Sequence, residues 1–535
     1  MKNHNIALAI AASQGEDARF FLQELARENQ NLRREHEAQQ LQIKYLKEEN
    51  EYYRKTLFAP SSEKRHVESV PTTQLNLIFN EAEAVVSSPN VEEKKPENDS
   101  EPKPEPKKRG RKPLPPDLSR DEKRVSPAKA CSCCGRDRTC LGEETIEQID
   151  VQPAKMIVKR TVREKLVCRN PACEEFEKVE TAPLEPQIIP QSLATPGTLA
   201  HVITAKYADG SPLYRQESQF LRMGIEISRG TLANWVIKTA EACYTVNELL
   251  LEDLRAGPAV NMDETPLQVL NEPGRKSTDE SRMWVARGGP PERPVVIFRY
   301  SPSKSGKVAS GILGSFQGFL QTDGYVGYEL VGKRPGIRHL GCLAHVRRKF
   351  FDVEKISKGS PWKGVARQAL DIIKEIYAIE RKADYLEMDP DQRKTLRQEK
   401  AKPLLDQLKA LLDKHKDSAP PKSLLGRAIT YALNQWDLLL VYLENGILRP
   451  DNNAAENAIR PFVIGRKNWL FAASQKGAEA SATLYSIIET AKANGLEPYA
   501  YLRFLFTELP KAKLETDIKV LLPQYVDRNR LAVNP

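Results

Sequence analysis

Three acidic side chains stand where they could share one metal-dependent site. Asp263 and Asp323 each end a short apolar run, and Glu456 lies within the polar stretch 449–461. Carboxylates held close together repel, which raises one pKa unless cations bind between them. Their oxygens suit Mg²⁺ or Mn²⁺, and two such ions can drive an in-line attack of a water or a hydroxyl on phosphorus. The pattern predicts Asp263, Asp323 and Glu456 as the catalytic residues and Mg²⁺ ligands of a phosphoryl-transfer site.

The stretch 449–461 predicts a helix around Glu456. It opens with Asp451 and Asn452, which are good N-cap residues, so Glu456 falls in the first helical turn. Basic residues on or after this helix are predicted to bind the scissile or flanking DNA phosphates: Arg460, Arg466 and Lys467. The alternative is a capped helix with a solvated cluster of charges.

The elements that must position the three acids begin at residue 258. The pattern there predicts three strands, a helix, a strand, a helix, a strand and a helix, with the first strand ending at Asp263 and the fourth at Asp323. This is the element order of a ribonuclease-H-like fold, in which an antiparallel meander is extended by right-handed parallel crossovers. The ends of its first and fourth strands lie side by side. Glu264 is expected to point away from this site.

At 535 residues the chain is too long for one compact core. The predicted fold class is multidomain, mainly α plus α/β. The predicted parts are a coiled-coil, leucine-zipper-like helix (1–65), a disordered linker (66–127), a small zinc-binding β module (128–180), a helical DNA-binding domain (181–256), a ribonuclease-H-like core (257–354 and 446–490) with a helical insertion (355–445), and a C-terminal segment (491–535).

The N-terminal part carries two signals for assembly and DNA binding. Residues 18–60 repeat apolar residues at heptad spacing, which favours a dimeric coiled coil over a single amphipathic helix packed on its own protein. The linker holds a basic run in which Arg109 and Arg111 flank a glycine, and such a run can lie in the minor groove of A·T-rich DNA. A solvated basic run is the alternative for these two arginines.

Six of the eight cysteines lie between residues 131 and 173. Four of them are predicted to hold a structural Zn²⁺ through their thiolates: Cys131, Cys134, Cys168 and Cys173. Alternating residues in 147–164 predict strands that bring the two halves together, and Cys133 and Cys140 are left over. Free thiols are the alternative.

Two further helices carry candidate DNA contacts. Residues 227–236 resemble the turn and second helix of a helix-turn-helix, with Ser228 as the cap and with Arg229 and Asn234 exposed toward a major groove. A plain helical bundle fits the same pattern. Arg347 and Arg348 lie on the helix after the fifth strand and are predicted to contact phosphates, or else to form a solvated face.

The net charge is modest for the length. The 81 basic and 72 acidic residues give +9, which favours a polyanionic partner only where the positive charge clusters. The only N-terminal apolar run is too short to span a bilayer and lacks the flanks of a signal peptide. We therefore expect a cytoplasmic protein that has no membrane partner.

Four motifs in order resemble a known family. They are Asn261-Met-Asp-Glu-Thr265, Gln321-Thr-Asp-Gly-Tyr325, the segment 339–350 and the segment 449–461. Together they are similar to the core motifs of bacterial DDE transposases of the insertion sequence 66 family, and the zipper-like start and the cysteine pairs also match.

The resemblance implies cleavage of the ends of an insertion element and joining of their 3′-hydroxyls to target DNA, with Asp263, Asp323 and Glu456 as metal ligands. It also implies double-stranded DNA as partner, a homodimer or higher oligomer, and small accessory proteins encoded by the same element. The competing hypotheses are a DNA-binding regulator with a degenerate core and a nuclease without joining activity.

Overall fold

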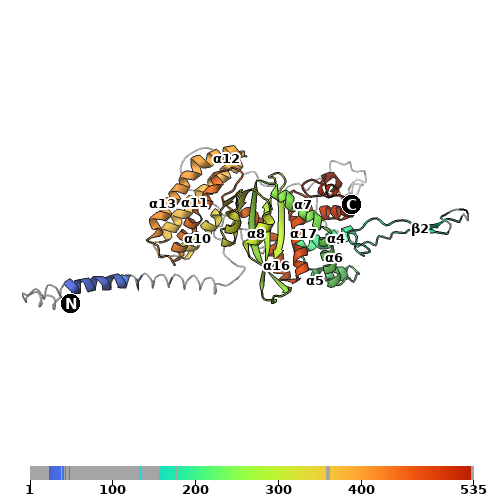
Figure 1. Ribbon diagram of the computed structural model, residues 1–535, viewed down its shortest axis with the longest axis horizontal. Coiled ribbons are helices and arrows are strands. Elements are labelled where there is room, and N and C mark those ends of the chain that lie inside the picture. The colour runs from blue at the N-terminus through green and yellow to red at the C-terminus, as the bar shows by residue number, and fades with distance from the viewer. Residues whose placement is uncertain are drawn as a thin grey trace, which may run out of the picture. The chain divides into compact units, whose positions relative to one another are not determined.

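The computed structural model describes residues 156–169, 177–356 and 362–531, the N-terminal stretch 23–37, and the single positions 39, 40, 43, 47, 133, 136, 172 and 174. The chain divides into two units, one made of residues 1–59 and 158–535 and the other of residues 60–157. Nearly all of the second unit lies outside the described residues. The elements below belong to the first unit, and many of the helices are labelled in Figure 1.

The central feature is a sheet with the strand order β5-β4-β3-β6-β7. Strand β4 pairs antiparallel with both β3 and β5, whereas β6 pairs parallel with β3 and β7 pairs parallel with β6. This confirms the predicted meander with its parallel extension. The bounds are β3 (Ala259–Asn271), β4 (Glu280–Gly288), β5 (Val295–Ser301), β6 (Gly318–Gln321) and β7 (Ile337–Leu340).

The first strand is longer than predicted. Instead of ending at Asp263, β3 continues to Asn271, because burial keeps alternating through Thr265, Leu267 and Val269. The short strand β8 (Ala472–Ser474) pairs parallel with this extension. The predicted strand end at Asp263 is therefore wrong, and Asp263 stands inside a strand.

The helices that follow β5, β6 and β7 lie where the sequence predicts them. They are α8 (Gly306–Leu313), the short pair η2 (Val326–Tyr328) and α9 (Glu329–Gly332), and α10 (Leu343–Ile356). The segment before β3 is helical too, with α4 (Pro196–Tyr207), α5 (Leu213–Arg222), α6 (Arg229–Ala242) and α7 (Tyr244–Arg255).

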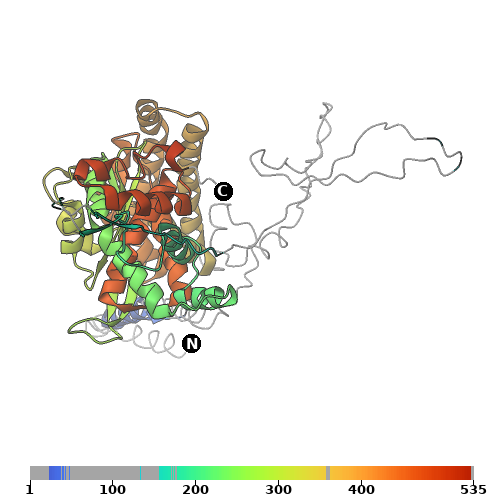
Figure 2. The ribbon, with the colours of Figure 1, turned by 90° about the vertical axis from the view of Figure 1, so that its right-hand side faces the viewer.

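Helix α17 (Gln475–Ala493) joins these layers. It contacts β5 along its length, and α4, α6 and α7 pack against it, as does the C-terminal helix α18 (Pro498–Glu508). After a quarter turn, the orange-red C-terminal helices are seen against the green strands (Figure 2). The helical segment 181–256 therefore shares a hydrophobic core with the sheet.

Polar side chains of α17 bind the free edge of β5. Val296 N donates to Thr490 Oγ1 at 3.0 Å, and the same hydroxyl bonds Val296 O at 3.0 Å. Phe298 N donates to Ser486 Oγ at 2.8 Å, and Asn494 Nδ2 donates to the carbonyl oxygen of Pro294 at 2.8 Å. The spacing fits because four helical residues rise about 6 Å and two strand residues about 6.8 Å. A helix thus takes the place of a sixth strand along this edge.

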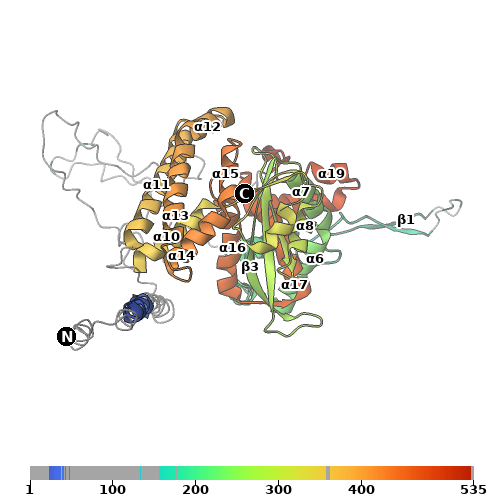
Figure 3. The same ribbon diagram turned by 60° about the vertical axis from the view of Figure 1, so that its left-hand side comes forward.

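The insertion after α10 is helical, as predicted. Its main helices are α11 (Trp362–Tyr385), α12 (Pro390–Leu396), α13 (Lys402–Lys416), α14 (Leu424–Asn434) and α15 (Trp436–Leu440). Figure 3 shows α10, α11, α13 and α14 gathered together. They share a core in which Ile376 is buried and Ile372 and Ile379 pack at its margin.

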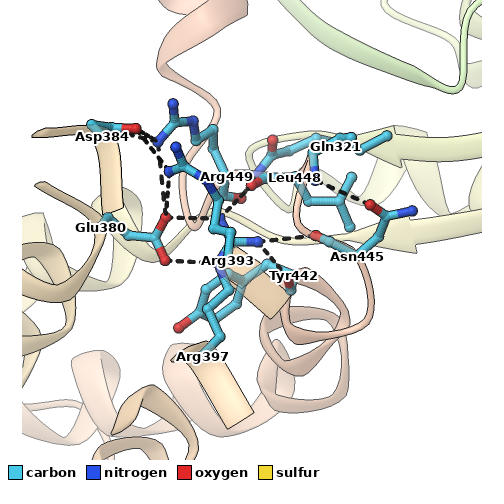
Figure 4. A network of polar contacts seen from close by, with 10 residues as sticks. Gln321, Glu380, Asp384, Arg393, Arg397, Tyr442, Asn445, Leu448 and Arg449 are labelled. Atoms are coloured by element: carbon cyan, nitrogen blue, oxygen red, sulfur yellow. Dashed lines mark hydrogen bonds and ion pairs between the residues drawn. The ribbon is translucent and has the colours of Figure 1, made fainter. Parts of the chain in front are cut away.

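A buried ion-pair network ties the insertion to the segment that leads into the predicted acid Glu456 (Figure 4). Arg397 has no exposed surface, and its Nε and Nη2 donate to the two oxygens of Glu380 at 2.8 and 2.7 Å. Its remaining N–H groups donate to the carbonyl oxygens of Tyr442, Asn445 and Leu448 at 3.1, 2.9 and 2.7 Å. All five donors of the guanidinium are therefore satisfied.

The N-terminal and zinc-module predictions are only partly covered. Residues 23–37 are helical, and Leu25 and Leu32, which belong to the predicted seam, are exposed. Strands were predicted within residues 147–164, but residues 156–164 form none. Strand pairing begins at β1 (Lys165–Val167), which pairs antiparallel with β2 (Val179–Thr181). Cys168 follows β1 directly. Outside the described residues lie Arg109, Arg111, Cys131, Cys134 and Cys173.

Candidate active site

Asp263 lies on β3, and Asp323 lies at the same level, two residues past the end of the neighbouring strand β6. Asn261 of β3 is in register with Gln321 of β6, and each acid follows two residues later. Backbone N–H groups orient both acids, since Glu264 N donates to Asp263 Oδ1 at 2.8 Å and Tyr325 N donates to Asp323 Oδ1 at 2.9 Å. The structure thus brings the first two predicted acids together.

The third acid comes from α16 (Asn453–Trp469), which carries Glu456 in its first turn as predicted. Asp451 caps this helix, because its Oδ1 accepts from Asn453 N at 3.1 Å. The predicted capping role of the Asn452 side chain is wrong: it makes no cap hydrogen bond and instead donates to Met262 O at 2.8 Å. This bond fixes the start of α16 against β3.

Burial is the main cause that raises the pKa of Asp263 to about 7; the backbone hydrogen bond from Glu264 opposes it, and the negative charges of Asp323 and Glu456 add to it. A cation placed beside this carboxyl group would favour its ionised form and lower its pKa. Three acids from segments far apart in sequence thus act on one another electrostatically.

Three amide side chains connect the segments beneath the acids, and the sequence analysis missed them. Asn261 Nδ2 donates to Gln321 Oε1 at 2.8 Å and to Asn452 Oδ1 at 3.1 Å. Gln321 Nε2 donates to the carbonyl oxygens of Gly341 and Arg449 at 3.2 and 2.9 Å. A usable signal existed: Asn261 and Gln321 are polar residues in apolar runs, two positions before an acid, so each shares a strand face with that acid.

Glu264 contacts a different set of side chains, as expected from strand alternation. Its side chain is 5% exposed and lies 3.1 Å from Lys304 Nζ. Tyr328 Oη donates to Glu264 Oε2 at 2.7 Å. Glu264 therefore has its own partners and stays outside the candidate site.

The donor set fits a divalent cation. Glu456 Oε1 is buried and has no hydrogen-bond partner, although an unsatisfied buried carboxylate oxygen is costly. The oxygens of Asp263, Asp323 and Glu456 do not all lie within 4.8 Å of one another. Two ions about 3.5–4 Å apart need a wider cradle than one ion. The all-oxygen set suits Mg²⁺ or Mn²⁺.

Family models match four parts of the chain. The model described as "Transposase IS66 family" matches residues 191–480, more than half of the chain. The chain belongs to this transposase family. The IS66 C-terminal element matches residues 486–524, the "Transposase C of IS166 homeodomain" residues 45–122, and the zinc-finger binding domain of transposase IS66 residues 128–174.

Two curated relatives are similar to most of this chain. "Uncharacterized protein y4jD" of Sinorhizobium fredii is 36% identical over 73% of this chain and 76% of that protein. "Uncharacterized protein y4qI" of the same organism is 33% identical over 85% of this chain and 84% of that protein. The zinc-finger match supports a structural Zn²⁺ in residues 128–174, and the transposase and homeodomain matches imply DNA as a partner. Among the helices of the described residues, none is long and apolar enough to cross a membrane.

The basic residues predicted to bind phosphates have different surroundings in this transposase-family chain. Arg348 Nη2 lies 4.0 Å from Glu456 Oε2, and Arg460, half-buried, follows Glu456 one turn later on α16. Arg347 is half-buried, and Lys467 is exposed. Arg466 is engaged differently, because its Nη1 donates to Thr265 Oγ1 at 2.9 Å and to Pro266 O. Arg466 thus holds α16 against β3.

The helix-turn-helix-like segment of the transposase has the predicted local structure. Ser228 caps α6 by accepting from Thr231 N at 3.2 Å. The predicted core positions Leu232, Trp235 and Val236 are buried. Arg229 and Asn234 are exposed, as predicted, although Arg229 lies 3.9 Å from a carboxylate oxygen of Glu217.

Proposed function

We propose that this chain is a DNA transposase that cleaves the ends of its insertion element and joins their 3′-hydroxyls to target DNA by two-metal phosphoryl transfer. One observation supports the proposal: three acids from distant segments stand around a continuous amide linkage, Gln321–Asn261–Asn452, with Asn261 in the middle. The strand order β5-β4-β3-β6-β7 supports a ribonuclease-H-like core.

In this mechanism Asp263 of β3 and Asp323, just past the end of β6, would hold divalent cations together with Glu456 from the first turn of α16. Bound Mg²⁺, or Mn²⁺, would activate the attacking oxygen and offset charge on the leaving oxygen. Burial around Asp263 limits access of water and strengthens these contacts. Arg348 and Arg460, beside Glu456, would bind the flanking phosphates, and their guanidinium groups suit bidentate contacts.

Further parts of the proposal lie away from the acids. Cys131, Cys134, Cys168 and Cys173 are proposed as the ligands of the structural Zn²⁺. Arg109, Arg111, Arg229 and Asn234 are proposed to contact the double-stranded DNA of the element ends. The N-terminal helix would join two or more copies, and accessory proteins of the same element would assist.

The test uses the full chain and a labelled duplex that carries one end of its own element. We expect nicking and 3′-end joining that require added Mg²⁺ or Mn²⁺ and disappear with Asp263→Asn. Cleavage without joined product under every divalent ion would favour a nuclease. A gel shift of the terminal DNA that survives without divalent ions, with no cleavage at all, would favour a regulator and overturn the proposal.

A further inference from the structure

A second group of metal-binding side chains meets at Glu456. Cys342 Sγ, a ring nitrogen of His345 and a carboxylate oxygen of Glu456 all lie within 4.8 Å of one another. Among the described residues, it is the one group of three or more His, Cys, Asp and Glu side chains whose ligand atoms lie this close together. Its donors are sulfur, nitrogen and oxygen, unlike the all-oxygen set of the proposed Mg²⁺ site.

Two atoms of this group lack partners. His345 Nδ1 and Glu456 Oε1 are both buried, and neither has a hydrogen-bond partner. They lie 3.9 Å apart, which is too long for a hydrogen bond between them. Each such atom costs about 1–3 kcal/mol when left unsatisfied. A ligand between them would satisfy both.

The surrounding backbone holds the three side chains in place. Cys342 immediately precedes α10 and His345 lies in its first turn, so their spacing puts them on one face. The start of α10 is joined to the segment before α16, because Leu343 N donates to Pro450 O at 2.8 Å. Asn452 N donates to Cys342 Sγ at 3.2 Å. This N–H donor favours the thiolate, whereas burial raises the pKa of the Cys342 thiol to about 12, so a bound cation would displace the thiol proton.

We propose that Cys342, His345 and Glu456 form a binding site for a thiophilic divalent cation of the Zn²⁺ class. Thiolate, imidazole and carboxylate are the three side-chain ligands that Zn²⁺ takes, and Mg²⁺ takes oxygen alone. In a tetrahedral zinc site sulfur and nitrogen ligands stand about 3.5 Å apart, so small side-chain movements close the group. His345 and Glu456 are 23% and 25% exposed, which leaves a fourth position open to water.

This site would control the proposed reaction, and that consequence rests on the proposed function. Glu456 belongs to both donor sets. A cation held by Cys342 and His345 would withdraw Glu456 from the Mg²⁺ site, so Zn²⁺ would inhibit DNA cleavage in competition with Mg²⁺.

The binding test measures zinc per chain by equilibrium dialysis followed by elemental analysis. It compares the full-length protein with Cys342→Ser and with His345→Gln. Cys243→Ser is the matched control, because Cys243 is also buried and free but belongs to no such group. We expect each site variant to hold one zinc fewer than the wild type and the control to lose none. The predicted zinc module is present in all four proteins, so the difference is independent of its occupancy.

Cobalt gives a second readout. Replacing zinc by Co²⁺ should add a thiolate-to-cobalt absorption that Cys342→Ser lacks and Cys243→Ser keeps. Equal stoichiometry and equal spectra in wild type and Cys342→Ser, with both proteins folded by circular dichroism, would overturn the proposal.

The activity arm separates this inference from the proposed function. With terminal DNA and fixed Mg²⁺, we expect Zn²⁺ to inhibit the wild type at a concentration at least about tenfold below that needed for Cys342→Ser, each relative to its own zinc-free rate. A chain that binds the extra zinc but never cleaves DNA would sink the transposase proposal and leave the site. A chain that cleaves DNA, with no zinc difference, would do the reverse.

Discussion

Asn261 Nδ2 donates a hydrogen bond to Gln321 Oε1 across 2.8 Å, and this bond joins the two strands that carry Asp263 and Asp323. Gln321 is 4% exposed, and its Nε2 also donates to the backbone carbonyl oxygens of Gly341 and Arg449. The acids thus depend on a linkage that contains no charge. Its strength can be measured apart from catalysis.

Gln321→Leu should lower the free energy of unfolding by about 2–3 kcal/mol, because it removes the hydrogen bonds to the carbonyl oxygens of Gly341 and Arg449 and one of the two bonds that the Asn261 amide donates. Urea titration followed by circular dichroism measures this. Gln317→Leu, at an exposed position four residues earlier, is the control and should stay within about 0.5 kcal/mol of wild type. Equal stability of the two variants would contradict the proposed linkage.

Substitution of the adjacent acids Asp263 and Glu264 should affect the rate of DNA cleavage differently. Asp263→Asn should lower metal-dependent cleavage by at least about 100-fold, because it removes a proposed cation ligand. Glu264→Gln should keep the rate within about tenfold of wild type, because Glu264 binds Lys304 and Tyr328 instead. Initial rates on labelled terminal DNA distinguish them. A collapse of activity in Glu264→Gln with intact folding would place Glu264 in the site.

The raised pKa of Asp263 predicts a pH-dependent stability. The carboxyl group of the unfolded chain ionises near pH 4, whereas the folded one stays protonated until about pH 7. The contribution of this carboxyl group to the free energy of unfolding is therefore greatest below pH 4. It is lost as pH rises toward 7, by at most about 4 kcal/mol.

Unfolding measurements from pH 4 to 8 without added divalent ions should show this loss in the wild type and not in Asp263→Asn. Adding Mg²⁺ at pH 7–8 should stabilise only the wild type, because the cation favours the charged carboxylate. Parallel pH profiles for the two proteins would show that the Asp263 carboxyl group is not perturbed.

Removing the buried guanidinium of Arg397 should weaken the attachment of the helical insertion to the segment 442–448. Arg397→Met leaves Glu380 6% exposed with its main partner gone, and breaking such a pair costs about 3–5 kcal/mol. Protease digestion should then cut the segment 442–448 faster. Arg427→Met, at an exposed position on α14, is the matched control and should change neither stability nor cleavage.

Local pattern was enough to predict most of the core. The strand order, the helices of the insertion, the cap at Ser228 and the helix around Glu456 were all accessible from residue period and capping chemistry. The end of the first strand was missed although burial alternates past Asp263: β3 pairs with β4 as far as Gln268, and only its last pairings, at Val269 and Asn271, are with β8 from far along the chain. Long-range pairing of this kind leaves no local signal.

The polar contacts were harder to predict than the elements. Arg397 and Glu380 read as ordinary charged positions on helices, and only the packed fold shows that both are buried. Asn452 read as a helix cap, yet its side chain reaches across to Met262 O. Such partners are chosen by tertiary geometry, which a propensity argument does not contain.

The row of hydroxyl and amide groups on α17 has a consequence for how copies of this chain can assemble. An open strand edge is a template for a further strand from another molecule, and proteins commonly block such edges. Here Val296 and Phe298 already have their N–H and C=O groups bound to Thr490 and Ser486. Sheet continuation through β5 from one copy into the next is thus closed off, and an oligomer must be built through other surfaces.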